Sequence, residues 1–198
     1  MNFFKLAALI SFLGLFTGCG WQDIPKAKNS LEAAMAEVTN QYKRRSDLIP
    51  NLVKAVQGYA SHEKETLEGV ISARAKATSV NIDASTLDPK KMAEFQQAQG
   101  QLSQALGRLM VISENYPQLK ADQNFRDLQA QLEGTENRIT VARNRYIESI
   151  KGFNDLVTVP PTSWTNSLFY HHEKMPQWDV SAEEKSKIEA APEVNFGK

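Results

Sequence analysis

The chain has 198 residues, of which 41% are hydrophobic, and its 23 basic residues balance its 23 acidic ones. This length suits one folded domain, and the balanced charge excludes the basic surface by which proteins bind nucleic acid or an anionic bilayer. Because the chain holds one cysteine, it forms no internal disulfide, so its stability must come from a packed core.

The N-terminus has the layout of a bacterial lipoprotein signal. Lys5 precedes an apolar run and small residues that end at Cys19. The run over residues 6–18 is shorter than the roughly 20 residues that a membrane-spanning helix needs. We therefore expect residues 1–18 to be removed as a signal peptide and Cys19 to carry acyl chains such as palmitate, with residues 19–23 as a short tether.

The residues around the cysteine bear on where the protein is held. Gly20 follows the cysteine, where Asp would mark retention in the inner membrane. We expect a lipid-anchored protein of the bacterial cell envelope, on the periplasmic face of the outer membrane in a host with two membranes and otherwise on the outer face of the cell membrane. Phe16 stands where lipoprotein signals usually have Leu. The alternative is soluble secretion, with Gly18-Cys19-Gly20 serving as a weak Ala-x-Ala-like cleavage site.

Apolar residues then recur three and four positions apart, a spacing that predicts amphipathic helices. The first stripe consists of Leu31, Met35, Val38, Tyr42, Arg45, Ile49, Leu52, Val56, Tyr59, Glu63, Thr66, Val70, Ala73 and Ala77. Pro50 lies inside this stripe, and a proline within a helix costs about 3 kcal/mol or more. The helix could break there, with Ser46 or Asp47 capping a new helix, could break instead at Gly58 and Ser61, or could continue as one kinked helix.

Two further helices follow a loop expected at residues 78–88. The second stripe consists of Met92, Phe95, Gln99, Leu102, Leu106, Leu109, Ile112 and Tyr116, and the third of Phe125, Leu128, Leu132, Thr135, Ile139, Ala142, Tyr146, Ser149, Phe153 and Leu156. The third stripe predicts a helix over residues 122–157 that Asp122 caps. We expect an all-α fold, an antiparallel up-and-down bundle of long helices over residues 24–159. Four helical segments are favoured, or three if the first helix continues through Pro50.

Aromatic residues gather after the last predicted helix, which Pro160 and Pro161 end. They include Trp164, Tyr170 and Trp178, and we expect residues 160–180 to form a strap that packs on the bundle and covers its end. Alternatively, the three aromatic residues form an interface for a partner, since Trp and Tyr are frequent interface anchors. Residues 181–198 are expected to be a flexible tail.

Several polar residues interrupt the apolar stripes or lie beside them. The candidates for a functional or structural role are Arg45, Asp47, Glu63, Arg138 and Arg143. One interpretation is a polar layer that fixes the register of the helices, because a buried charge persists only with a partner. The other is a groove in which a partner or peptide docks.

The sequence offers no recognisable catalytic or metal-binding motif. The three histidines, His62, His171 and His172, lack the Glu-x-x-His spacing of di-iron bundles. Phosphate-binding loops, zinc-protease motifs and nucleophile elbows are also absent from the sequence. We therefore expect neither an enzyme nor a cofactor.

Several motifs together resemble the LemA family of bacterial membrane-associated proteins. They are Lys43-Arg-Arg-Ser-Asp-Leu-Ile-Pro-Asn-Leu-Val53, Gly58-Tyr-Ala-Ser-His-Glu63, Ala73-Arg-Ala75, Leu102-Ser-Gln-Ala-Leu-Gly-Arg-Leu109, Glu114-Asn-Tyr-Pro-Gln-Leu-Lys120, Asn124-Phe125, Leu132-Glu-Gly-Thr-Glu-Asn-Arg-Ile139 and Ala142-Arg143. The resemblance covers about residues 24–157 and implies an antiparallel helical bundle at a bacterial membrane with no established reaction. It also implies, by association alone, an envelope partner such as a metallopeptidase or a TPM-domain protein.

These observations favour a non-catalytic structural or adaptor protein of an envelope assembly, bound to the membrane through its lipid. The alternative is a regulator or sensor that binds a peptide or small ligand in a groove of the bundle. Neither interpretation involves nucleic acid as a partner.

Overall fold

The computed structural model describes residues 21–84 and 88–178. The signal peptide expected at residues 1–18, the lipidation expected at Cys19 and the tail expected at residues 181–198 lie outside this range. Helices are the only regular secondary structure in the described part of the chain, so the predicted all-α class is confirmed.

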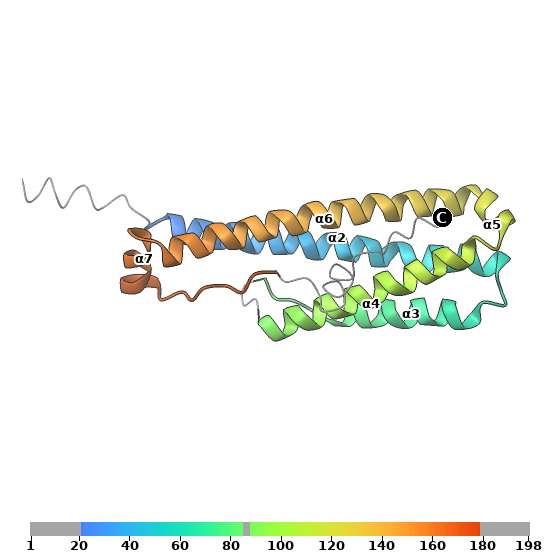
Figure 1. Cartoon of the computed structure of the whole chain (residues 1–198), viewed down its shortest axis with the longest axis horizontal. Coiled ribbons are helices and arrows are strands. Elements are labelled where there is room, and N and C mark those ends of the chain that lie inside the picture. The colour runs from blue at the N-terminus through green and yellow to red at the C-terminus, as the bar shows by residue number, and fades with distance from the viewer. Residues whose placement is uncertain (1–20, 85–87, 179–198) are drawn as a thin grey trace, which may run out of the picture. The chain divides into compact units, whose positions relative to one another are not determined.

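Four long helices make up most of the described chain (Figure 1). They are α2 (Asp23–Tyr59), α3 (Lys64–Ser79), α4 (Pro89–Ser113) and α6 (Gln123–Thr158), with the shorter α5 (Pro117–Ala121), α7 (Thr162–Thr165) and the π-helical turn η1 (Asn166–Tyr170). The favoured prediction of four long helical segments is confirmed. Asp122 caps α6 as predicted, because its Oδ1 accepts the N–H of Phe125 at 2.9 Å.

Pro50 does not end the first helix. It lies inside α2, and the break comes at residues 60–63, the second of the two sites considered. A proline has no N–H, so the carbonyl of Ser46, one turn earlier, loses its partner within the helix. Arg74 on α3 replaces that partner, since its Nε donates to the Ser46 carbonyl oxygen at 2.8 Å. Ser46 is 1% exposed, so α3 supplies a hydrogen bond to a carbonyl that has little access to water.

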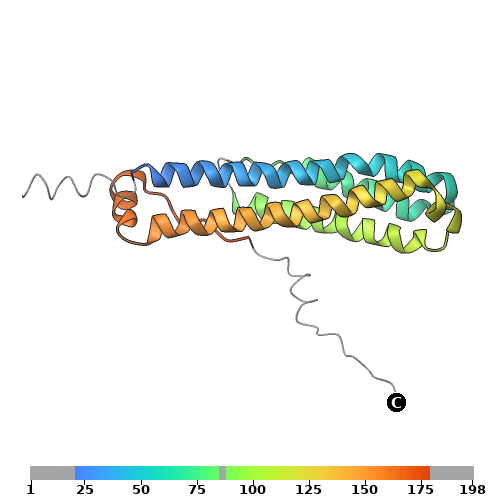
Figure 2. The same cartoon turned by 90° about the horizontal axis from the view of Figure 1, so that it is seen from above.

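The described chain divides into two compact units, and the larger one comprises residues 39–84, 88–139 and 178. Within this four-helix unit, the second part of α2, then α3, α4 and the first part of α6 run up and down in turn (Figure 2). All four helices and α5 contribute to one core cluster, which includes Ile49, Leu52, Val56, Val70, Ala73, Leu102, Leu106, Leu109, Leu119, Phe125 and Leu132. Most of these residues belong to the predicted stripes, but the first stripe shifts by one position at the break between α2 and α3. Ala60 and Leu67 are buried there in place of the predicted Tyr59, which is 45% exposed, and Thr66, so the prediction was wrong at these two positions.

The second compact unit comprises residues 21–38 and 140–177 and is called the terminal unit below. In it, the first part of α2 and the last part of α6 lie side by side, and α7 lies at their end (Figures 1 and 2). Both helices contribute buried side chains to this unit, namely Ile24, Leu31, Met35, Val38, Ala142, Tyr146, Ile150, Phe153 and Val157. The segment after η1 is extended and returns along the helices, since the side chain of Asn154 bonds both the N–H and the carbonyl of Met175.

Candidate functional site

Arg45 lies at the centre of the four-helix unit and is 1% exposed. Its Nη1 donates to Ser103 Oγ at 2.8 Å and to Glu136 Oε1 at 2.5 Å, so it joins α2 to α4 and α6. Its Nη2 donates to the side-chain oxygen of Gln99 at 2.7 Å and to the Gln99 carbonyl at 3.2 Å. One charged group thus links three helices at a single level of the bundle.

Neighbouring residues complete this polar layer. The ring of Tyr42 lies under the Arg45 guanidinium at 4.9 Å, and it meets Phe95 edge to face at 5.1 Å. The amide of Gln99, itself buried, donates to the carbonyl of Ala77 at 3.2 Å, so α3 joins the layer as well. Within the described residues, Arg45 Nε has no hydrogen-bond partner. Hydrogen bonds of this layer thus connect all four helices.

A surface groove borders this layer between α4 and α6. Its volume is about 290 Å³, and its lining residues are Ser103, Leu106, Gly107 and Met110 of α4 with Gln129, Leu132, Glu133 and Glu136 of α6. Each helix contributes positions i, i+3, i+4 and i+7, which form one continuous face of a helix. Ser103 and Glu136 contact Arg45 as well, so the buried layer holds one wall of the groove in place.

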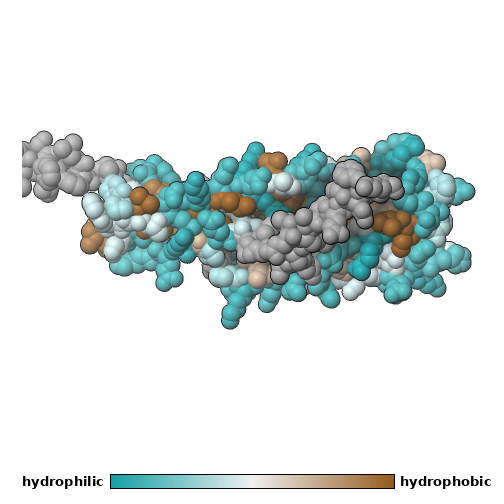
Figure 3. All heavy atoms as spheres, in the orientation of Figure 1, coloured by the Kyte–Doolittle hydropathy of each residue, from teal (hydrophilic) through white to brown (hydrophobic). Residues whose placement is uncertain are grey.

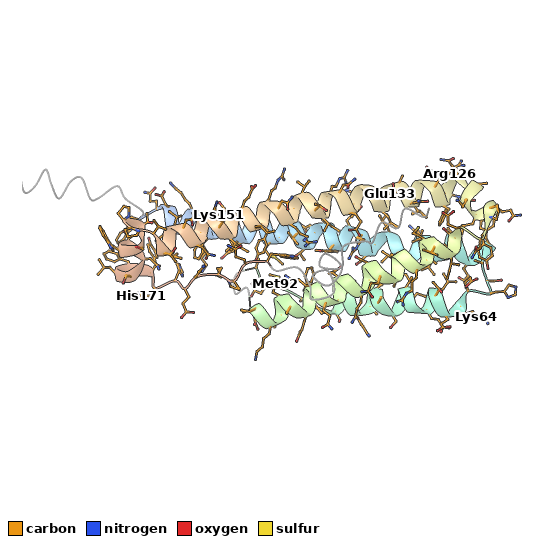
Figure 4. All side chains as sticks on the ribbon, viewed as in Figure 1. Lys64, Met92, Arg126, Glu133, Lys151 and His171 are labelled. Atoms are coloured by element: carbon orange, nitrogen blue, oxygen red, sulfur yellow. The ribbon has the colours of Figure 1, made fainter. Side chains whose placement is uncertain are left out.

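The groove has an apolar floor and acidic edges. Leu106, Met110 and Leu132 supply the floor, whereas Glu133 and Glu136 are the charged side chains among its lining residues. The Glu136 side chain remains 49% exposed although it pairs with Arg45. Glu133 lies on α6 (Figure 4) and accepts a hydrogen bond from Gln129 at 3.2 Å. This arrangement suits a ligand with apolar side chains and a cation.

The other predicted polar residues do not gather at this layer. Asp47 and Arg138 are exposed, and Arg143 is half-buried in the terminal unit. Glu63 is half-buried beside the α2–α3 junction, where it accepts a hydrogen bond from Tyr116 Oη at 2.9 Å. This hydrogen bond raises the pKa of the Tyr116 phenol, because the carboxylate stabilises its protonated form.

Thr135 and Ser149, which interrupt the third stripe, satisfy their hydroxyl groups within α6. Thr135 Oγ1 donates to the Gln131 carbonyl at 2.7 Å, and Ser149 Oγ donates to the Arg145 carbonyl at 2.9 Å. Such bonds to the preceding turn let a hydroxyl face a neighbouring helix without a partner on it.

A second candidate surface lies at the α7 end of the terminal unit. The ring of Trp21 meets that of Phe169 at 4.5 Å, and Tyr170 Oη donates to the Trp21 carbonyl at 2.6 Å. Tyr170 stacks on His172 at 5.9 Å, and His172 in turn lies 5.7 Å from the buried ring of Phe153. Burial lowers the pKa of His172, and the charge of Lys28 adds to the effect.

Backbone and amide hydrogen bonds hold these aromatic residues in place. Asn166 is buried, and its side chain bonds the N–H of His172 and the His172 carbonyl, each at 2.9 Å. His171 lies at this end (Figure 4) with a left-handed backbone, φ 55°, and donates its N–H to the Asn166 carbonyl at 2.7 Å. A left-handed residue at this position is a common way to end a helical turn.

The sequence of this chain is similar to that of known proteins. A profile of the LemA family matches residues 34–196. The chain belongs to the LemA family. A protein named LemA from Metamycoplasma hominis is 23% identical over 167 residues, which cover 84% of this chain and 70% of that protein. The match includes the Arg45 layer and the α4–α6 groove, and it confirms the resemblance drawn from the sequence motifs.

In the described part of this LemA-family chain, the histidines and carboxylates do not form a metal-binding group. His62 is exposed at the α2–α3 junction, and the residues that the structure describes include no group of three or more His, Cys, Asp or Glu side chains placed to hold a metal ion. Over the same residues, no helix combines the length and apolar character needed to cross a bilayer.

Some contributors to these sites are missed by reasoning from the sequence. Trp21 falls within the expected tether, Arg74 supports Pro50, and Asn154 and Asn166 fix the segment after α6. Of the three predicted interface aromatics, Trp164 is 59% exposed, while Tyr170 and Trp178 are half-buried. The available signal was Asn154, which lies on an otherwise apolar face of α6. A buried asparagine needs hydrogen-bond partners, and here they are the backbone groups of Met175.

Proposed function

We propose that this LemA-family protein is a lipid-anchored, non-catalytic adaptor of the bacterial envelope, whose α4–α6 groove receives an amphipathic helix of a partner protein. The groove is the observation that carries this proposal. The expected lipid on Cys19 would hold the adaptor at the membrane surface. The family resemblance suggests an envelope metallopeptidase or a TPM-domain protein as the source of the partner helix.

The dimensions of the groove favour a helix over a small ligand. Its volume of about 290 Å³ lies at the lower limit of the roughly 300–1,000 Å³ of small-molecule pockets. Helix-in-groove recognition needs less space, because only the anchor side chains at i, i+3, i+4 and i+7 are enclosed. The groove is lined by one row of residues on α4 and one on α6. The apolar stripe of a partner helix could lie between these two rows.

The charge of the groove specifies the partner further. Glu133 and Glu136 lie on the same side, one turn apart, so a Lys or Arg beside the apolar stripe of the partner would face them. We therefore expect a helix with Leu-like anchors and at least one flanking basic residue. The alternative role, a sensor of a small molecule, would not require a helix with apolar anchors and a flanking basic residue.

Photo-crosslinking in living cells tests this proposal. Gly107 lines the groove and a Cβ built there meets nothing within 4 Å, so this position is chosen for a benzophenone amino acid. Gly152, an exposed helical glycine with equally open surroundings in the terminal unit, provides the matched control. The expected result is a crosslink from position 107, and not from 152, to a mapped peptide with an apolar helical stripe and a flanking basic residue.

Charge substitution makes the experiment specific. Glu133→Lys should reduce the crosslink from position 107 several-fold, because the acidic edge would then repel the partner's cation. Equal crosslinking from both positions, or a yield that does not respond to Glu133→Lys, would contradict the adaptor proposal. An adduct of a small molecule alone would replace it with the sensor role.

A further inference from the structure

Large hydrophobic side chains are exposed together at the α7 end of the terminal unit. Five of the nine exposed large hydrophobic residues of the described chain belong to residues 21 and 159–169, namely Trp21 (53%), Val159 (52%), Trp164 (59%), Leu168 (71%) and Phe169 (57%). Figure 3 shows hydrophobic surface at this end. Isolated exposed apolar side chains are ordinary, whereas a contiguous group marks a surface that contacts something apolar. We call these five residues the aromatic end.

The aromatic end is ordered by specific contacts. Trp21 is fixed to the segment around η1 by the ring of Phe169 and by the hydrogen bond from Tyr170. Trp164 and Leu168 lie four positions apart on successive helical turns, so both project from one side of this short segment. The backbone that carries these side chains is therefore ordered before any contact is made.

The position of the aromatic end in the chain identifies what it meets. Trp21 follows Cys19 by two residues, a reach of at most about 7 Å. A lipid on Cys19 would therefore bring this end of the terminal unit directly to the membrane surface. Trp and Tyr are the residues that accumulate at the headgroup level of bilayers, where their rings are apolar and their polar atoms stay hydrated.

We propose that the aromatic end inserts into the headgroup region of the phospholipid bilayer and seats the protein on its membrane. The inference depends on the proposed anchor at Cys19, and it adds a second contact that fixes the orientation of the terminal unit. The contact is apolar, which agrees with a chain whose 23 basic residues only balance its 23 acidic ones. Insertion of this kind reaches about 5–10 Å into the interface.

The three tryptophans of the chain allow a direct test. The full chain, extracted from cell membranes, is reconstituted in phosphatidylethanolamine and phosphatidylglycerol vesicles that contain brominated phosphatidylcholine, which quenches tryptophan fluorescence at the bilayer. One variant keeps Trp164 alone (W21F, W178F), and its matched control keeps Trp178 alone (W21F, W164F). Trp164 is decisive, because Trp21 would be quenched by its closeness to the lipid even without insertion.

We expect the Trp164 variant to be quenched several-fold more strongly than the Trp178 control. Equal quenching would overturn the proposal, and so would protection of Trp164 by a dimer that sedimentation detects. Should W178F unfold the chain, the W21F single variant compared with the Trp178 control isolates the same Trp164 signal.

The experiment distinguishes a missing lipid anchor at Cys19 from a missing contact of the aromatic end with the bilayer. A chain that does not float with the vesicles and shows an unmodified Cys19 by mass spectrometry would refute the anchor in the proposed function. Its single thiol can then be coupled to a maleimide phospholipid, which supplies the tether chemically. Quenching of Trp164 in this coupled form would still support the aromatic end as a bilayer contact, and its absence would overturn it.

Discussion

In the four-helix unit the charged side chain of Arg45 is 1% exposed, whereas in the terminal unit the apolar side chain of Leu168 is 71% exposed. Both departures from ordinary burial are supported by local contacts. Arg45 has Ser103, Glu136 and Gln99 as partners, so groups on two other helices compensate its buried charge. The aromatic end is fixed by the ring contact between Trp21 and Phe169 and by the hydrogen bond from Tyr170, and we propose that its exposure serves the bilayer contact. We therefore propose a structural role for Arg45 and a binding role for the aromatic end.

The largest effect should come from Arg45→Ala. The substitution removes the link among three helices and leaves the buried side-chain oxygen of Gln99 without its donor, so we expect a loss of about 3–5 kcal/mol in the free energy of unfolding by urea. Arg138→Ala removes an exposed arginine from α6 and should change stability by less than about 0.5 kcal/mol. Similar values for the two variants would show that the buried layer does not hold the bundle.

A smaller effect should follow from Arg74→Ala. The Ser46 carbonyl would lose its partner, which costs about 1–3 kcal/mol for a buried polar group. In a Pro50→Ala background, the alanine N–H can bond the same carbonyl, so Arg74→Ala should cost much less there. A double-mutant cycle measures this coupling, and additive effects of the two substitutions would refute the proposed support of Pro50.

High pH should weaken the terminal unit through Tyr146. Burial raises the pKa of Tyr146 to about 12, so between pH 10 and 12 the phenol ionises in the unfolded chain before it ionises in the folded protein. Stability is therefore retained below pH 10 and falls as the pH rises through this window. Tyr146→Phe should remove part of the fall, on the order of 1 kcal/mol, in unfolding measured at pH 9 and pH 11.5. An identical pH profile for the two proteins would contradict this assignment.

The smallest change in stability is expected at the aromatic end. Because Trp164 and Leu168 are exposed, the double substitution W164S, L168S should alter the free energy of unfolding by less than about 0.5 kcal/mol. The same variant, tethered to vesicles, should rotate more freely, as fluorescence anisotropy of a surface label can show. Loss of several kcal/mol would mean that these residues belong to the core and that the comparison of the two units is wrong.

Periodicity predicted the long helices and most of their buried residues, because the spacing of apolar side chains is a local property of the sequence. It also placed Arg45 at a core position. The Arg74–Ser46 bond could not be predicted, since it joins a side chain to the backbone of another helix. The groove depends on the lateral placement of α4 and α6, which a single sequence does not specify. Trp21 was assigned to a tether because its partners lie about 150 residues further along the chain.

The lipid anchor is the central claim, because both the adaptor role and the seating of the aromatic end depend on a protein held at its membrane. Intact mass spectrometry of the chain purified from host membranes tests it most directly. The account predicts a polypeptide that begins at Cys19, lacks residues 1–18 and carries a diacylglycerol and an amide-linked acyl chain. A chain that retains residues 1–18, or one with a free thiol at Cys19, would contradict it.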